Sequence, residues 1–233
     1  MPRNLYILTF IILTRTTFGQ VAIVRDKDGF CNIRNAANSA SKVIDKLSNN
    51  KIIYCFADQN IGEWYEIEYT RKGQELTGYI HKSRVVFIDK LRNINTRLIN
   101  DSTIKSTSDS FKLTIAFGNF ISSKHSIKYE KPQNESRFVK KIDNKFPWGT
   151  DGNIPKKEYK KFQLQIGLQT ILIDKETYKD LFEPNLKETK IFFDRVSKSY
   201  FVTAQNSDAA GGYTVVWTFK DNTFQSREIF RGF

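Results

Sequence analysis

The residue types that could carry nucleophilic chemistry are rare in this chain of 233 residues. There are two cysteines, Cys31 and Cys55, and two histidines, His81 and His125. A Cys–His nucleophile needs an exposed thiolate beside an imidazole, whereas Cys31 falls on the inward side of an alternating segment. We expect His81 to be a packed structural imidazole and His125 to be solvated in a polar turn. Nucleophilic catalysis is therefore not predicted.

The spacings that other enzyme classes need are also missing from the sequence. There is no His-Glu-x-x-His zinc helix, no Gly-x-Ser-x-Gly nucleophile turn and no Gly-x-Gly-x-x-Gly fingerprint. The acidic turn at residues 26–29 lacks the third acidic position and the distal Glu of a calcium loop. We therefore expect a protein that is not an enzyme, with no catalytic residue, no metal and no cofactor.

Two glycine-containing loops hold the acidic residues with the best claim to a site. Asp151 follows Trp148 closely, and Asp208 precedes a Gly-Gly pair. Their carboxylates could converge on a cation or on a substrate hydroxyl, which makes Trp148, Asp151 and Asp208 a candidate loop site. Asp in such loops more often stabilises the turn by hydrogen bonding to its own backbone, and we favour that interpretation. Trp148 is predicted to anchor the core, because large aromatic side chains usually supply burial.

The elements around these residues are short apolar segments separated by turns. Between residues 21 and 88 the segments alternate: Cys31 and Ile33 share one face of a strand, and Tyr65 and Ile67 share another. Short strands at this spacing, with no helical period, indicate a compact barrel or sandwich. The fold class we predict is therefore mainly β.

Three runs in this region carry a family resemblance: residues 28–34 (DGFCNIR), 62–67 (GEWYEI) and 78–85 (GYIHKSRV). Together with residues 39–47 they resemble the bacterial SH3b domain, which has an Asn-hydrophobic-Arg run, a Gly-Trp-Tyr-like strand and a closing Gly-aromatic-hydrophobic-His segment. The order and spacing match over nearly all of residues 21–88. The chain departs from the pattern at Cys31, where an aliphatic residue is usual, and at Tyr79, where Trp is common.

The resemblance implies an SH3-like β-barrel over residues 20–88, with a shallow groove for peptides or cell-wall glycopeptide. Trp64 and Tyr79 would line that groove, with Tyr54 a weaker candidate. The alternative is that these aromatic side chains only close the small core. Cys31 and Cys55 would both face inward, either as a buried thiol pair or as a disulfide, and an oxidising compartment would allow the disulfide.

The first nineteen residues have the layout of a secretory signal peptide. Arg3 gives a positive start, residues 5–13 are apolar, and Thr17 and Gly19 are small residues at the −3 and −1 positions of a cleavage site. We predict cleavage near Gly19 and a periplasmic or secreted protein with no remaining transmembrane anchor, because the apolar run is too short to span a bilayer. The alternative is a buried N-terminal strand or helix.

The rest of the chain is predicted to form a linker and a second domain. Residues 89–110 are mostly polar and suggest a linker with one helical turn near residues 91–99. Residues 111–233 suggest a mostly antiparallel β domain with one short helix, capped by Asp174 and stopped by Pro184. Segments 148–152, 179–186 and 206–213 resemble an uncharacterised β domain of exported bacterial proteins, which brings no known activity.

The charge is positive and uneven. The net charge is +12, and residues 91–233 hold 24 Lys and Arg against 16 Asp and Glu. A solvated, Lys-rich surface accounts for most of this charge, although an acidic partner would also suit it. Export and the lack of a nucleic-acid motif argue against nucleic acid as the partner.

These observations predict an exported, non-catalytic binding protein whose SH3b module engages cell-envelope peptidoglycan or a peptide ligand. One alternative is an envelope hydrolase with the barrel as its targeting module. Asp151 and Asp208 would then be acid and base, about 5–9.5 Å apart for glycoside cleavage. Another alternative is an inhibitor or immunity-like protein that binds an acidic partner, which moderate salt would release.

Overall fold

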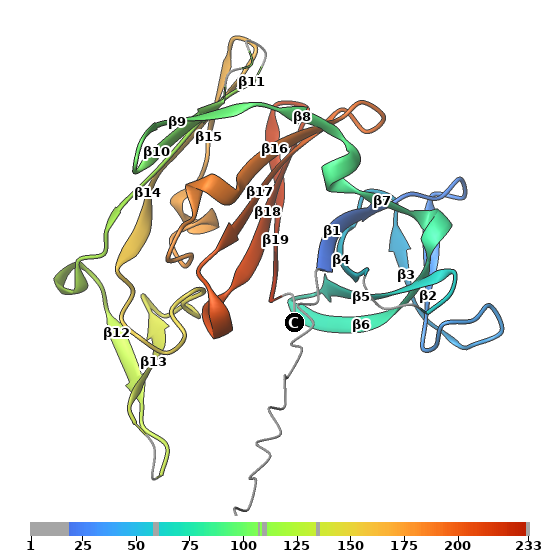
Figure 1. Cartoon of the computed structure of the whole chain (residues 1–233), viewed down its shortest axis with the longest axis horizontal. Helices are drawn as coiled ribbons and strands as arrows, with labels where there is room; N and C mark the ends of the chain where they lie inside the picture. Colours follow the sequence, from blue (N-terminus) through green and yellow to red (C-terminus); the bar gives the residue numbers. More distant parts are fainter. Residues whose placement is uncertain (1–18, 58–60, 107, 109–110, 134–135, 232–233) are drawn as a thin grey trace, which may run out of the picture.

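The structure is a computed structural model that describes residues 19–57, 61–106, 108, 111–133 and 136–231. The predicted signal peptide, apart from Gly19, lies outside the described residues. The described chain is mainly β, as predicted, and its larger sheets are antiparallel throughout. They form three layers, with a curled N-terminal sheet on one side of a central sheet and another sheet on the opposite side (Figure 1).

The N-terminal sheet curls into a half-barrel of seven strands in the order β3-β2-β6-β5-β4-β1-β7. These are β1 (Gly19–Val24), β2 (Phe30–Arg34), β3 (Val43–Ser48), β4 (Ile52–Phe56), β5 (Trp64–Arg71), β6 (Gln74–His81) and β7 (Val85–Phe87), with 3-10 turns at Lys82–Arg84 and Ile88–Lys90. The alternation predicted from the sequence is present, because Ile33, Ile67 and Ile80 are fully buried inside the curl. Gly78 lets β6 close on β2, since a Cβ atom there would lie 2.5 Å from a methyl group of Ile33.

The C-terminal part consists of two five-stranded sheets and a protruding hairpin. The outer sheet has the order β15-β14-β11-β10-β9, and the central sheet has the order β19-β18-β17-β16-β8. The outer strands are β9 (Thr96–Asn100), β10 (Thr103–Ser106), β11 (Phe111–Asn119), β14 (Lys157–Ile166) and β15 (Gln169–Leu172). The central strands are β8 (Arg92–Ile94), β16 (Thr189–Asp194), β17 (Ser199–Asn206), β18 (Tyr213–Lys220) and β19 (Thr223–Phe230), and the hairpin is β12 (Ile127–Glu130) with β13 (Phe138–Ile142).

The interpretation of residues 89–110 as a linker is wrong. Strands β8, β9 and β10 lie in this stretch and belong to the two C-terminal sheets. Strand β8 is an edge of the central sheet, and β9 is an edge of the outer sheet, so most of their side chains face solvent and can be polar. Ile94 and Ile104 insert into the core between the two C-terminal sheets, and Leu91 packs against the cluster beside the half-barrel. The chain therefore crosses from one sheet to the other within this segment.

The predicted short helix is a single 3-10 turn at Lys175–Thr177. The side chain of Asp174 caps it, as predicted, by accepting a hydrogen bond from the backbone N–H of Glu176. Within the described residues the other helical segments are also 3-10 turns, at Ser122–Lys124, Leu186–Glu188 and Ala209–Gly211. No helix in this part of the chain is long and apolar enough to cross a membrane.

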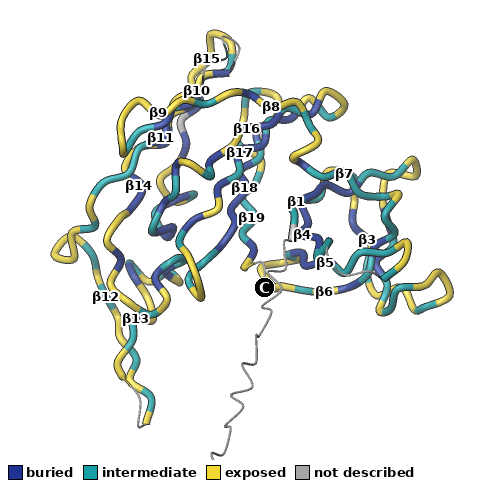
Figure 2. Tube along the Cα trace, in the orientation of Figure 1, coloured by how far each residue is buried: buried dark blue, intermediate teal, exposed yellow. Residues whose placement is uncertain are grey.

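Both faces of the central sheet are buried (Figure 2). One face carries Val202, Val215 and Trp217 into the core shared with the outer sheet. The other face carries Phe201 and Val216 against the half-barrel. A strand buried on both faces needs apolar residues at successive positions, which explains the unbroken run at Val215, Val216 and Trp217.

The half-barrel and the central sheet are joined by apolar and ionic contacts. Tyr54 of β4 stacks on Phe230 of β19, with ring centroids 5.7 Å apart. Arg25 pairs with Asp194 at 2.6 Å, and Lys51 pairs with Glu228 at 2.6 Å. The contact places the half-barrel firmly on the back of the C-terminal sheets.

Candidate functional site

A cleft of about 340 Å³ opens on the outer face of the half-barrel, where β2, β5 and β6 present outward side chains. We call it the half-barrel cleft. It is lined by Asp26, Asp28, Phe30, Cys31, Asn32, Arg34, Ser39, Trp64, His81, Ser83 and Arg84. Trp64 and His81 face each other across β5 and β6 as a registered pair, and their rings meet edge to face with centroids 5.3 Å apart. Phe30 is 40% exposed, so the cleft offers accessible aromatic surface.

The polar groups of this cleft are partly fixed by their own partners. His81 Nδ1 accepts a hydrogen bond from the backbone N–H of Ser83 at 3.2 Å, which sets the orientation of its ring. Arg84 pairs with Asp26 at 3.2 Å, and Arg34 donates to the carbonyl of Ser41.

One polar atom in the wall of this cleft has no hydrogen bond. The side-chain oxygen of Asn32 is buried and has no partner among the described residues. A buried acceptor without a donor is costly, so Asn32 is an unsatisfied polar residue of the cleft lining.

The residues assigned to a groove from the family resemblance have different positions in the structure. Trp64 lines the half-barrel cleft. Tyr79 lies two residues before His81 on β6 and therefore on the same outward face, but it does not line the cleft. Tyr54 is 5% exposed, stacks on Phe230 and lines a different cavity of about 230 Å³ between the half-barrel and the central sheet, so it is not part of the half-barrel cleft. Its strand is buried on both faces because its outer face meets the central sheet.

Cys31 and Cys55 are buried, free thiols, and no disulfide joins them. Burial, with a smaller contribution from Asp26, raises the pKa of the Cys31 thiol to about 11. Burial also raises the pKa of Cys55. The sequence allowed either a disulfide or a pair of buried thiols, and the structure contains the buried thiols. Neither thiol is suited to nucleophilic chemistry at neutral pH.

The two loops that contain Asp151 and Asp208 meet in space. Both aspartates line a second cleft of about 730 Å³, which we call the loop cleft. It is formed by residues from segments 149–157, 183–185 and 207–209. Trp148 lies beside this cleft without lining it, and packs against Phe146 and Tyr213.

The expectation that these aspartates stabilise their own turns is wrong. Asp208 precedes the 3-10 turn at Ala209–Gly211, but its side chain makes no capping hydrogen bond. Within the described part of the chain, neither carboxylate takes part in a hydrogen bond or an ion pair. Both side chains are exposed at the cleft. Two acceptor groups are therefore left unused on one concave surface.

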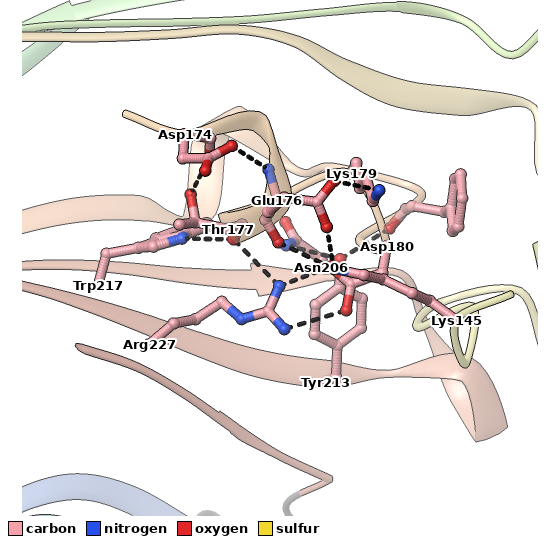
Figure 3. Close-up of polar contacts among 11 residues, drawn as sticks. Lys145, Asp174, Glu176, Thr177, Lys179, Asp180, Asn206, Tyr213, Trp217 and Arg227 are labelled. Carbon is pink, nitrogen blue, oxygen red and sulfur yellow. Dashed lines mark hydrogen bonds and ion pairs between the residues drawn. The ribbon is translucent and has the colours of Figure 1, made fainter. Parts of the chain in front are cut away.

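A buried polar network lies next to the residues of the loop cleft, and Figure 3 shows its members Asn206 and Tyr213. Tyr159 donates to the side-chain oxygen of Asn206 at 3.1 Å, and Asn206 donates to the hydroxyl of Tyr213 at 3.1 Å. That hydroxyl donates in turn to the carbonyl of Phe182 at 2.9 Å. The network ties the end of β17, the start of β18 and the segment before Glu183 together.

A second set of contacts holds the segment around the 3-10 turn at Lys175–Thr177 against the central sheet (Figure 3). Arg227 of β19 forms a two-pronged ion pair with Asp180, at 2.5 and 3.0 Å. Arg227 and the indole N–H of Trp217 both donate to the carbonyl of Thr177. Such planar, two-pronged pairs fix orientation as well as distance.

Sequence reasoning missed a cluster around His125. This residue was expected in solvent, but its side chain is 12% exposed and lies between two carboxylates. Its Nδ1 is 2.7 Å from Asp143, and its Nε2 is 3.3 Å from Glu158. Although burial raises the pKa of Asp143, hydrogen bonds from His125 and Ser126 hold it below its ordinary value. The cluster fastens the β12–β13 hairpin to β14. No local pattern in the sequence indicated it, because its three members lie far apart in the chain.

The described residues contain no group of three or more His, Cys, Asp or Glu side chains that could hold a metal ion. Comparison of the chain with protein-family models, curated proteins and solved structures finds no significant match. The fold and the clefts therefore define the class of protein by themselves. The described chain is a three-layer β protein, in which the half-barrel cleft and the loop cleft lie on different parts of the fold.

Proposed function

We propose that this protein is a non-catalytic binding protein of the cell envelope. In this proposal the half-barrel acts as an SH3b-type module, and the half-barrel cleft takes a peptide-like ligand such as the peptide part of peptidoglycan. The protein would be exported after cleavage near Gly19. The observation that carries the proposal is the Trp64–His81 pair, which presents aromatic surface in a concave site with polar groups around it.

The composition of the half-barrel cleft favours a short peptide over a small anion or a cation. Binding sites for small ligands combine apolar contact area with a few placed polar groups. Trp64 and Phe30 supply the contact area, and Ser39 and Ser83 supply hydroxyl groups in the lining. The lining carries both positive and negative side chains, including the ion pair of Arg84 with Asp26. A ligand with both donors and acceptors, such as a peptide, matches that lining.

The test is sedimentation of residues 20–233 with purified peptidoglycan sacculi. We expect the wild-type protein in the pellet together with the sacculi. We expect no released glycan fragments in the supernatant. Trp64→Ala should weaken binding by about 30-fold, because loss of a central aromatic contact costs about 2 kcal/mol. Tyr129→Ala is the matched control, since Tyr129 is a half-exposed aromatic residue on the separate β12–β13 hairpin. Thermal unfolding of both variants checks that they remain folded.

Two results would overturn this proposal. Wild-type protein that stays in the supernatant at low and moderate salt would remove peptidoglycan as the ligand. Equal loss of binding in Trp64→Ala and Tyr129→Ala would remove the half-barrel cleft as the binding site.

One observation keeps the envelope hydrolase as a second candidate. Asp151 and Asp208, the acid and base candidates of that alternative, line the same cleft and lack partners among the described residues. Release of soluble fragments from the sacculi by the wild-type protein, and its loss in Asp208→Ala, would favour the hydrolase.

A further inference from the structure

We infer that the loop cleft is a binding site for a hydroxyl-rich saccharide, the glycan part of the same envelope polymer. The inference rests on the proposed function for the source of the ligand. It places a second contact on the C-terminal sheets, away from the half-barrel cleft. The evidence comes from the backbone of the cleft, from the contacts that hold it, and from the chemistry of its lining.

The backbone around the loop cleft is unusual. Eleven residues other than glycine have positive φ angles in the part of the chain that the structure describes. Six lie in short turns between paired segments, and Asn50 lies in the β3–β4 connection. The remaining four all line the loop cleft: Asp151, Glu183, Ser207 and Ala209. Asp151 and Ala209 lie in hydrogen-bonded turns, whereas Glu183 and Ser207 lie at bends. Strained backbone of this second kind tends to gather at functional sites.

Direct contacts hold these strained segments against one another. The hydroxyl of Ser207 donates to the carbonyl of Gly149 at 2.9 Å, and the N–H of Ser207 donates to the carbonyl of Glu183 at 2.9 Å. The carboxylate of Glu183 accepts hydrogen bonds from the N–H groups of Lys156 and Lys157. All three segments of the cleft are thereby linked. A site of fixed shape loses less entropy on binding than a flexible one.

The carboxylates of Asp151 and Asp208 differ from that of Glu183 because no described residue uses them. Carboxylates are strong acceptors for hydroxyl groups, and hydrogen bonds with one ionised partner are stronger than neutral ones. Lys156 and Asn153 line the same cleft and can donate to a ligand oxygen. Donors and acceptors are thus mixed within one concave surface.

The balance of this lining selects among ligand classes. Two unpaired carboxylates disfavour an anion, and Lys156 and Lys157 in the same wall disfavour a cation. Ile154 is 47% exposed and supplies an apolar contact, as the C–H faces of a sugar ring require. A neutral ligand with many hydroxyl groups satisfies all of these side chains together. The volume of about 730 Å³ is in the range of a binding cleft for a small molecule or a short oligomer.

The test uses a short oligosaccharide of N-acetylglucosamine, which has no peptide, titrated into residues 20–233 and followed by calorimetry or NMR. The variants are Asp208→Ala and Asp151→Asn, because Asn tolerates a positive φ. Each should weaken binding about 10-fold, the effect of losing one charge-assisted hydrogen bond. Asp221→Asn is the matched control, since it makes the same change at a positive-φ residue of the β18–β19 turn, outside the cleft.

The outcomes separate this inference from the proposed function. Saccharide binding that is lost in Asp208→Ala and Asp151→Asn, but kept in Asp221→Asn and Trp64→Ala, supports the loop cleft. Absence of saccharide binding by wild-type protein that still sediments with sacculi overturns the inference and leaves the half-barrel proposal standing. Saccharide binding without sedimentation supports the loop cleft and overturns that proposal. Cleavage of the oligosaccharide supports the loop cleft as the glycan site and overturns the non-catalytic part of the proposed function.

Discussion

The ring of Tyr54 stacks on the ring of Phe230, at a centroid distance of 5.7 Å and an interplanar angle of 29°. The two residues come from opposite parts of the chain, the half-barrel and the last strand of the central sheet. Around them Ile52, Phe201 and Val216 form one buried apolar cluster. The half-barrel and the C-terminal sheets therefore share a core layer and should unfold together.

Truncation at this layer should uncouple the two parts. We expect Phe230→Ala to lower the free energy of unfolding by about 3–5 kcal/mol, because a fully buried aromatic side chain is lost and a cavity remains. Urea unfolding, measured by tryptophan fluorescence and far-UV circular dichroism, should change from one transition to two. Phe230→Leu is the conservative control and should keep a single transition. Unchanged stability of Phe230→Ala would contradict the shared core.

The ion pair between Arg25 and Asp194 should make this contact sensitive to acid. Although burial raises the pKa of Asp194, hydrogen bonds from Ser197 and Arg25 hold it below its ordinary value. A carboxyl with a lowered pKa stabilises the fold above its unfolded-state pKa, and that stabilisation is lost as the pH falls through the folded-state pKa. The loss should therefore begin only as the pH falls below about 4, the ordinary pKa of an aspartate.

Urea unfolding of the wild type and of Asp194→Asn at neutral and acid pH measures this contribution. Other carboxyls, such as Glu176, also have lowered pKa values, so the difference between the two proteins is the relevant quantity. That difference should be largest at neutral pH and should shrink in acid. A difference that stays constant with pH would show that the charge of Asp194 does not stabilise the fold.

Gly149 should be the least replaceable glycine near the loop cleft. Its φ is +91°, and a Cβ atom there would lie 2.6 Å from the carbonyl oxygen of Phe182 and 2.9 Å from the ring of Tyr213. We expect Gly149→Ala to cost more than about 2 kcal/mol, because strain and a backbone clash add together. Gly167→Ala is the matched control, since its φ is +58° with open space around the added atom. Gly167→Ala should lower the free energy of unfolding by about 1 kcal/mol, measured by thermal or urea unfolding. Equal losses in the two variants would contradict a steric clash at Gly149.

The half-barrel was predictable because several of its strands, such as β2, alternate between buried and more exposed residues. Ile33 and Ile67 each follow a period of two, and that period directly encodes which face of a strand is buried. Trp64 was assigned to a groove from the family resemblance, and it lines the half-barrel cleft. The burial of Tyr54 against the central sheet could not be predicted from local sequence, because the residues that cover it follow more than a hundred positions later.

Two C-terminal elements show where local patterns fail. Tyr178, Leu181 and Phe182 have helical spacing, yet Phe182 donates its N–H to the carbonyl of Trp148, and Trp148 donates to Asp180. The backbone of this segment pairs with a distant loop and has no need of helical hydrogen bonds. Strands β8 and β9 escaped prediction because edge strands with exposed side chains resemble polar linkers. The meeting of Asp151 with Asp208 depends on these same long-range contacts.

The two thiols should be unreactive while the protein is folded. Because burial and Asp26 raise the pKa of Cys31 to about 11, about one thiol in a thousand is ionised near pH 8. Cys55 has no exposed surface. We expect iodoacetamide to label neither cysteine in the native protein and both in urea, as measured by intact mass. Rapid labelling of Cys31 without denaturant would contradict its burial. A native protein lighter by two hydrogen atoms and resistant to labelling even in urea would show a Cys31–Cys55 disulfide in place of the thiols.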